Sequence, residues 1–206
     1  MALSLKKTLK ASEQERKDIK IQRELWSKYQ KTVSADRLIF LDESGVKTNM
    51  TRLYGRAYKG NRCYDKAPDG RWKTVTVLSS IRLDGTTESL MFEGAVDRKM
   101  FEAYIKHTLS PKLRPGDIVI LDNLSSHKSK TAKETIRSKG AEYIFLPAYS
   151  PDFNPIEKMW SKIKQLLRGL KARTHEELYA VVAKALSMIT QNDAQGWFES
   201  CGYEKI

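Results

Sequence analysis

Two acidic side chains stand at the ends of apolar runs, where folding could bring them together. Asp42 closes the run RLIFLDE at residues 37–43, and Asp122 closes GDIVILD at residues 116–122. Each run predicts a buried strand, and an ionised carboxylate is costly to bury without a partner. Taken singly, Asp122 is more typical of a turn or a helix cap, and Asp42 of a salt bridge to an arginine.

A third carboxylate follows in the stretch PAYSPDFNPIEKMW, residues 147–160. Asn154 is a good N-cap residue and Pro155 suits the first helical position, so Glu157 is predicted in the first turn of a helix. A glutamate there commonly caps the helix or stabilises its dipole. The stretch by itself therefore does not establish a catalytic role for Glu157.

The order of the elements decides whether these carboxylates can meet. Hydrophobic periodicity and capping residues predict these elements, in chain order: a helix at 12–30 opened by a capping box at Ser12 to Glu15, a strand at 37–43, an irregular basic loop at 44–67, strands at 72–83 and 87–96 joined by Asp84-Gly85, a helix at 97–109, a strand at 116–122, a helix at 129–139, a strand at 142–146, a helix from 155 and a helix at 176–189. A hairpin followed by alternating strands and helices predicts an α/β fold, with a mixed sheet and helices on both faces.

In such a sheet, adjacent parallel strands open at the same edge, and a helix that follows the next strand begins there. We therefore expect Asp42, Asp122 and Glu157 to converge. An oxygen-only site of this kind suits Mg²⁺ or Mn²⁺, and two such ions about 3.5–4 Å apart are the standard arrangement for attack at a phosphodiester. Two other carboxylates rank below these three as candidate metal ligands. Glu43 should point to the opposite side of its strand from Asp42, and Asp152 lies in the loop before the helix.

The amino-acid composition limits the kinds of binding partner that this protein can have. The 206 residues include 37 Lys and Arg against 25 Asp and Glu, a formal net charge of +12, which fits a nucleic-acid partner or a solvated charged face equally well. Cys63 and Cys201 have no paired spacing with the histidines, so neither a disulfide framework nor a zinc site is indicated. We find no membrane-span or signal-peptide pattern, and we expect a cytoplasmic protein without a membrane partner.

Candidate DNA contacts come from three places in the chain. Lys164 and Arg168 follow Glu157 on the same predicted helix face, where they could carry phosphates towards the site. The others lie in the 44–67 loop and in the loop after Asp122: Arg52, Arg56, Arg62, His127 and Lys128. Trp160 is expected to pack in the core rather than to stack on a base.

Three segments together resemble a known family. LDESG at residues 41–45, ILDNLSSHK at 120–128 and PAYSPDFNPIEKMWSKIK at 147–164 resemble the catalytic domain of mariner-superfamily DDE transposases, in the bacterial insertion-sequence branch. The 34 residues between Asp122 and Glu157 match the separation that this branch uses.

The resemblance implies a ribonuclease-H-like fold, with Asp42, Asp122 and Glu157 as ligands of two Mg²⁺ or Mn²⁺ ions. His127, which the motif includes, would contact a phosphate or lie behind the metal ligands. The implied reaction is DNA cleavage at transposon ends and joining of the freed 3′-hydroxyls to target DNA, typically at TA.

We expect residues 1–35, with nine Lys or Arg against four Asp or Glu, to be a basic linker helix region and residues 36–206 to be the catalytic domain. Complete members of the superfamily carry helix-turn-helix modules before this domain, which residues 1–35 could not form. We therefore expect a separately encoded DNA-binding half, and a homodimer on DNA. Two other functions stay open: a hydrolysis-only nuclease of the ribonuclease H or junction-resolvase type, and an inactive DNA-binding remnant.

Overall fold

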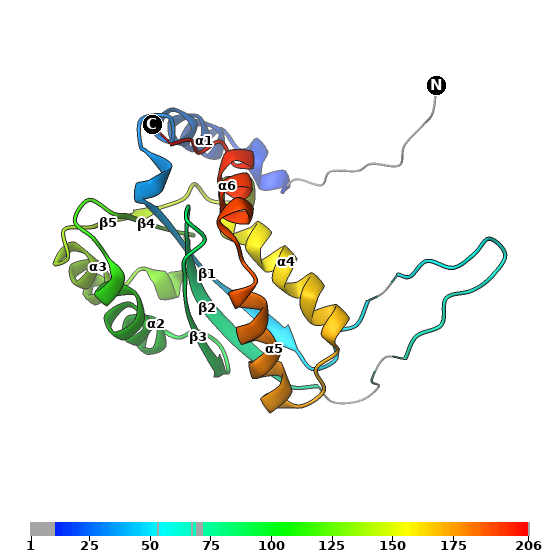
Figure 1. The fold of residues 1–206 in the computed structure, drawn as a ribbon. Coiled ribbons are helices and arrows are strands. Elements are labelled where there is room, and N and C mark those ends of the chain that lie inside the picture. Colours follow the sequence, from blue (N-terminus) through cyan, green and yellow to red (C-terminus); the bar gives the residue numbers. More distant parts are fainter. Residues whose placement is uncertain (1–10, 53, 67, 69–71, 206) are drawn as a thin grey trace, which may run out of the picture.

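A five-stranded mixed sheet forms the centre of the protein (Figure 1). The computed structural model describes residues 11–52, 54–66, 68 and 72–205, so the first ten residues of the predicted linker region lie outside the described residues. The strand order is β3-β2-β1-β4-β5. β1 pairs antiparallel with β2 and β2 with β3, whereas β4 runs parallel to both β1 and β5. The strands are β1 (Leu38–Lys47), β2 (Thr74–Arg82), β3 (Thr87–Glu93), β4 (Ile118–Leu121) and β5 (Glu142–Phe145). The predicted mixed sheet is confirmed.

The central strand β1 is longer than the sequence predicted. It continues past Glu43 because Gly45 and Lys47 pair with Thr76 and Thr74 of β2. The start of the predicted irregular loop 44–67 is therefore a strand, in which buried and exposed residues alternate. Asp42 consequently lies inside β1, next to the level at which its parallel neighbour β4 ends.

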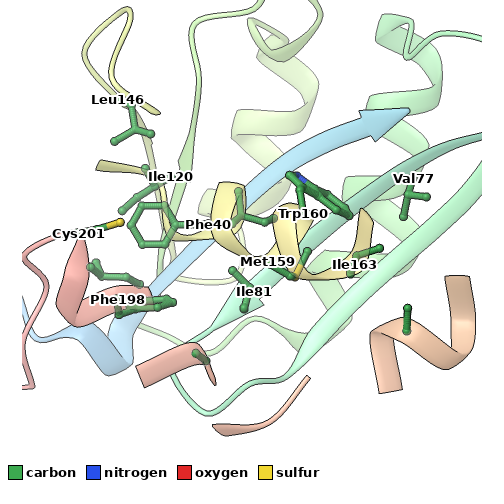
Figure 2. Close-up of a cluster of buried hydrophobic side chains, with 14 of the residues drawn as sticks. Phe40, Val77, Ile81, Ile120, Leu146, Met159, Trp160, Ile163, Phe198 and Cys201 are labelled. Atoms are coloured by element: carbon green, nitrogen blue, oxygen red, sulfur yellow. The ribbon is translucent and has the colours of Figure 1, made fainter. Parts of the chain in front are cut away.

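Helices cover both faces of the sheet, as predicted, and each face has its own hydrophobic core (Figure 1). Successive β1 residues alternate between the cores: Phe40 packs in the first, and Ile39 and Leu41 pack in the second. The first core is closed by α1 (Lys17–Tyr29), α4 (Pro155–Leu170), α5 (His175–Ser187) and α6 (Gln191–Ser200), and the second by α2 (Arg98–Tyr104), its π-helical continuation Ile105–Leu109 and α3 (Lys130–Arg137). Figure 2 shows part of the first core, where α4 and α6 meet the sheet.

The first helix begins later than predicted. Ser12–Glu15 is a short 3-10 helix, and α1 begins only at Lys17 after the extended Arg16. The Ser12 hydroxyl donates to the neighbouring Glu13 carboxylate, so the predicted capping box is wrong. Ser12–Glu15 buries no residue, so it has no packing that would extend the helix.

Helix α6 was not predicted, although its start carries a clear signal. The Thr190 hydroxyl accepts a hydrogen bond from the Asp193 backbone N–H, and the Asp193 carboxylate accepts one from the Thr190 N–H. This is a capping box with aspartate as its acid. The helix buries Ala194 and Phe198 in the first core. No described helix has both the length and the apolar content that a membrane crossing requires.

Helix α4 begins at Pro155, as predicted, but its cap differs from the prediction. The Asn154 carbonyl accepts from the Glu157 N–H at 3.2 Å, whereas the Asn154 side chain makes no capping bond and its buried Oδ1 has no partner. The fixed φ of Pro155 and the preceding extended residue therefore set the start of the helix without a side-chain cap.

Candidate active site

Asp42, Asp122 and Glu157 line one cavity of about 410 Å³. Asp42 comes from β1, Asp122 follows the last residue of β4, and Glu157 lies in the first turn of α4. The loop at 146–151 forms the rest of the wall together with Asn154 and the residues just after Asp122. The fold therefore gathers side chains separated by 80 and 35 positions in the sequence at one edge of the sheet.

The most deeply buried of the three carboxylates is Asp42, which is 9% exposed. Burial, and then the negative charges of Glu157 and Glu43, raise the pKa of Asp42 to about 7. The indole N–H of Trp160 donates to Asp42 Oδ2 at 3.1 Å. Trp160 packs in the core as expected, but its hydrogen bond to the site was not predicted.

Glu157 is an exposed residue, unlike Asp42, but its carboxylate is partly buried at the cavity and is influenced by a nearby cation. Burial raises the pKa of Glu157, the positive charge of Lys164 opposes this, and the negative charge of Asp122 adds to it. Lys164, seven residues further along α4, is partly exposed. The predicted placement of Lys164 on the same helix face as Glu157 is consistent with this coupling.

Asp122 is held through one oxygen. Its Oδ1 accepts from the Leu124 backbone N–H at 3.1 Å and lies 2.7 Å from Nδ1 of His127. His127 is fully buried, its ring packs against Phe101 with centroids 4.7 Å apart, and its Nε2 lies 3.1 Å from Glu43 Oε2. Burial lowers the pKa of His127, but the hydrogen bond with Asp122 and the negative charges of Glu43 and Asp122 outweigh burial and raise it to about 9.

This environment corrects one of the predicted DNA contacts. A side chain that is 0% exposed, with a carboxylate at each ring nitrogen, does not reach a phosphate, so the prediction that His127 contacts DNA is wrong for this structure. The other prediction for His127, a place behind the acidic residues of the site, agrees with its contact to Asp122. The spacing of five residues was visible in the sequence, whereas the burial of the ring depends on Phe101 of α2.

The two carboxylates that ranked lower lie outside the cavity, as expected. Glu43 faces the second core beside His127. Asp152 pairs with Arg23 of α1 at 2.6 Å, and the same guanidinium donates to Ser150 Oγ at 2.7 Å and lies over the ring of Phe153. Helix α1 therefore braces the loop that walls the cavity.

The remaining predicted DNA contacts lie at the surface. Arg52, Arg56 and Arg62 are exposed in the segment between β1 and β2, which extends away from the sheet in cyan and teal in Figure 1. Lys128 and Arg168 are also exposed. Their contacts with DNA stay predictions.

The β1, β4 and α4 arrangement around an acidic cavity defines an α/β domain of the ribonuclease-H-like class. Residues 37–179 match the family profile described as "DDE superfamily endonuclease", and this chain belongs to that family. The predicted resemblance to DDE enzymes is therefore confirmed for the family as a whole.

The solved structures that the fold matches include Mos1 transposase. The Mos1 paired-end complex with the left transposon end aligns with a TM-score of 0.73 at 16% identity, covering 97% of this chain and 63% of that one. The catalytic domain of Mos1 mariner transposase aligns with a TM-score of 0.61 at 14% identity, covering 95% of this chain and 91% of that domain. At these identities the likeness concerns the fold, and it confirms the predicted fold class.

Curated relatives in Caenorhabditis briggsae are also transposases. The transposable element Tcb1 transposase is 28% identical over 111 residues, covering 52% of this chain and 41% of the relative. The Tcb2 transposase is 32% identical over 84 residues, covering 39% of this chain and 31% of the relative. The aligned part is thus less than half of either relative. The chain is a DDE-type endonuclease domain with transposases as relatives.

Proposed function

We propose that this chain is the catalytic domain of a mariner-superfamily transposase, of the bacterial insertion-sequence branch, which cleaves DNA at transposon ends and transfers the freed 3′-hydroxyls to target DNA at TA sites. One observation carries the proposal: within a DDE endonuclease domain, Asp42, Asp122 and Glu157 line a single cavity. Their catalytic role is part of the proposal. The transposases among the relatives, and the Mos1 complex with transposon-end DNA, support this reaction over other uses of the fold.

We propose Mg²⁺ or Mn²⁺ as the cofactor, with two ions held by the three carboxylates. The donor set fits, because it offers only oxygen atoms and its negative charges already oppose the ionisation of Asp42. Among the described residues, no group of three or more acidic, histidine or cysteine side chains already stands close enough to hold an ion, so binding would have to draw these carboxylates closer. Mos1 paired-end complexes with Mg and with Mn are among the structural neighbours.

When bound, such ions would activate the attacking oxygen and stabilise the leaving oxygen of a phosphodiester. The protein's own residues supply the rest of the site. Trp160 donates to one oxygen of Asp42, and His127 lies against one oxygen of Asp122, so we propose that the other oxygen of each carboxylate binds the ions. The loop at 146–151 walls the cavity on one side.

DNA is the proposed partner, bound by the basic surface around the cavity. Lys164 stands close enough to Glu157 to act on its pKa, and Arg168 lies one turn further along α4. Phosphates that follow this helix would be led towards the carboxylates. The other proposed contacts are Arg52, Arg56, Arg62 and Lys128.

The organisation of the complete protein is also a proposal. We infer a catalytic domain at 36–206, preceded by the linker region 1–35, that acts as a homodimer on DNA in the cytoplasm together with a DNA-binding half. The linker is more than a tether, because α1 buries Ile19 and Trp26.

A strand-transfer assay tests the proposed function. The protein is incubated with pre-cut transposon ends, a plasmid target and Mn²⁺, and joined products are counted by gel and by sequencing of the junctions. We expect products with the parent and with Glu134→Gln, which changes an exposed carboxylate on α3, and none with Glu157→Gln.

The alternatives give different results. Hydrolysis without joining would support the hydrolysis-only nuclease. DNA-dependent activity that survives Asp122→Asn unchanged would overturn the role of the carboxylates. A parent protein that binds DNA but neither cleaves nor joins it would support the inactive DNA-binding remnant.

A further inference from the structure

The hydrogen bond between Trp160 and Asp42 links the core to the acidic cavity. Trp160 is 2% exposed and lies beside Met159 and Ile163 of α4 in the first core (Figure 2). Its indole Nε1 donates to Asp42 Oδ2 at 3.1 Å, and Asp42 is itself 9% exposed. Water therefore has little access to compete for this bond, which a buried carboxylate needs.

Helix α4 brings two groups to Asp42 at once. Glu157 and Trp160 are three residues apart on α4, so their side chains lie on neighbouring positions of the same helix face. Glu157 adds a carboxylate to the cavity, and Trp160 adds the donor that orients Asp42. The start of α4 at Pro155 thus sets both positions together.

The chemistry of the indole suits this role. Tryptophan is a donor only and carries no charge, so it can fix one carboxylate oxygen without neutralising the carboxylate. A lysine or arginine at the same place would compete with a cation for Asp42. Because the indole is locked by core packing, the direction of the second carboxylate oxygen is fixed as well.

We propose that Trp160 is a positioning residue of the active site, which holds Asp42 Oδ2 so that the other oxygen is presented to a divalent cation. This inference rests on the proposed function, because it assumes that Asp42 binds the cation. The proposed role of Trp160 thus adds a residue to the three carboxylates of the site, and gives this core side chain a second task besides packing.

Trp160→Phe removes the N–H donor while it keeps an aromatic side chain in the core. Trp26→Phe is the matched control, because Trp26 is also buried in the first core and its Nε1 donates at 2.9 Å to Tyr203 Oη, away from the cavity. Both variants lose one buried indole hydrogen bond, so a general loss of packing should affect both alike.

The first measurement is Mn²⁺ binding to each folded protein, by electron paramagnetic resonance. We expect Trp160→Phe to weaken binding about tenfold or more, as is typical of residues that orient metal ligands, and Trp26→Phe to stay within about twofold of the parent. In the strand-transfer assay, we expect the Trp160→Phe variant to need more Mn²⁺ for half-maximal activity, with most of the rate recovered at saturating metal.

The second measurement uses the parent protein, so it does not depend on the variant folding. With ¹⁵N-labelled tryptophan, the four tryptophans give four indole N–H signals in an NMR spectrum, and Trp160→Phe and Trp26→Phe identify two of them. If the Trp160→Phe protein does not fold, the indole signal that moves most between the parent and Asp42→Asn identifies Trp160 instead, because Asp42 is its hydrogen-bond acceptor. We expect Mg²⁺ to shift the Trp160 signal and to leave the Trp26 signal in place.

The outcomes separate the two levels of inference. A parent that binds no Mn²⁺ and joins no ends would overturn the proposed function. A parent that binds Mn²⁺, with a Trp160→Phe variant of equal affinity or a Trp160 signal that Mg²⁺ does not move, would overturn the positioning role alone.

Discussion

Replacing Asp42 by asparagine should make the metal-free protein more stable. Asp42 is buried beside Glu157, and burial together with the charges of Glu157 and Glu43 raises its pKa to about 7. Asparagine keeps the shape of the side chain and an oxygen that can accept from Trp160, but it removes the charge. Folding without a cation therefore no longer requires an ionised carboxylate to be buried.

The magnitude follows from the linkage between proton binding and folding. An aspartate in an unfolded chain has a pKa of about 3.9, so at pH 8 the raised pKa of Asp42 costs up to about 4 kcal/mol of unfolding free energy. Because the pKa of Asp42 is higher in the folded protein than in the unfolded chain, this loss of stability is complete above the folded-state pKa. It fades as the pH falls towards 4. At pH 5 it should be less than about 2 kcal/mol.

Guanidinium unfolding in EDTA at pH 8 and pH 5 measures this effect. We expect the asparagine variant to be the more stable protein at pH 8, with a smaller advantage at pH 5. Asp36→Asn is the control, because this exposed aspartate has a lowered pKa and its replacement should bring no gain. Mg²⁺ or Mn²⁺ should then stabilise the parent more than the variant.

Two results would refute this reasoning. Equal unfolding curves at pH 8 would mean that the buried carboxylate carries no cost in the folded protein. An advantage of the asparagine variant that grows at pH 5 would have the wrong sign for the titration of Asp42.

Three further predictions concern parts of the structure away from the cavity. In the folded protein one thiol should react with a maleimide, because Cys63 is exposed whereas Cys201 is buried and its pKa is raised to about 11 by burial; rapid labelling of both would contradict this. Asp117→Ala should lower the unfolding free energy by about 3–5 kcal/mol, because it leaves the buried guanidinium of Arg82 without its carboxylate partner, and adding Arg82→Met should restore part of the loss in urea unfolding. Thr174→Ala should cost about 1 kcal/mol in the same assay, because it removes the N-cap of α5, and an unchanged midpoint would show that the capping box does not contribute.

The sequence was informative about the sheet because each strand is a short apolar run bounded by turn residues. It was less informative about strand ends. β1 continues through Gly45 and Lys47 because β2 provides hydrogen-bond partners for them, and a run of residue types does not reveal how long the neighbouring strand is. The capping box predicted at Ser12 failed for a related reason, since a local motif forms a helix only where packing supports it.

The acidic residues of the site could be predicted, whereas their partners could not. The convergence of Asp42 and Asp122 follows from the parallel register of β1 and β4, which strand order alone suggests. The bonds from Trp160 and His127 depend on how α4 and α2 pack on the sheet. Their spacings from Glu157 and Asp122 were visible, but side-chain burial is a property of the whole fold.

The two cores have different roles at the cavity. Asp42 and Glu43 are consecutive in β1 and therefore face opposite sides of the sheet. Asp42 meets Trp160 of the first core, and Glu43 meets His127, whose ring packs against Phe101 of the second core and whose Nδ1 holds Asp122. Each aspartate of the cavity is thus anchored in a different core, and β1 connects the two anchors. Because Asp42 and Glu43 both belong to β1, this strand relates the two anchors, and the site is assembled at the edge of the sheet where β4 ends and not on one helix.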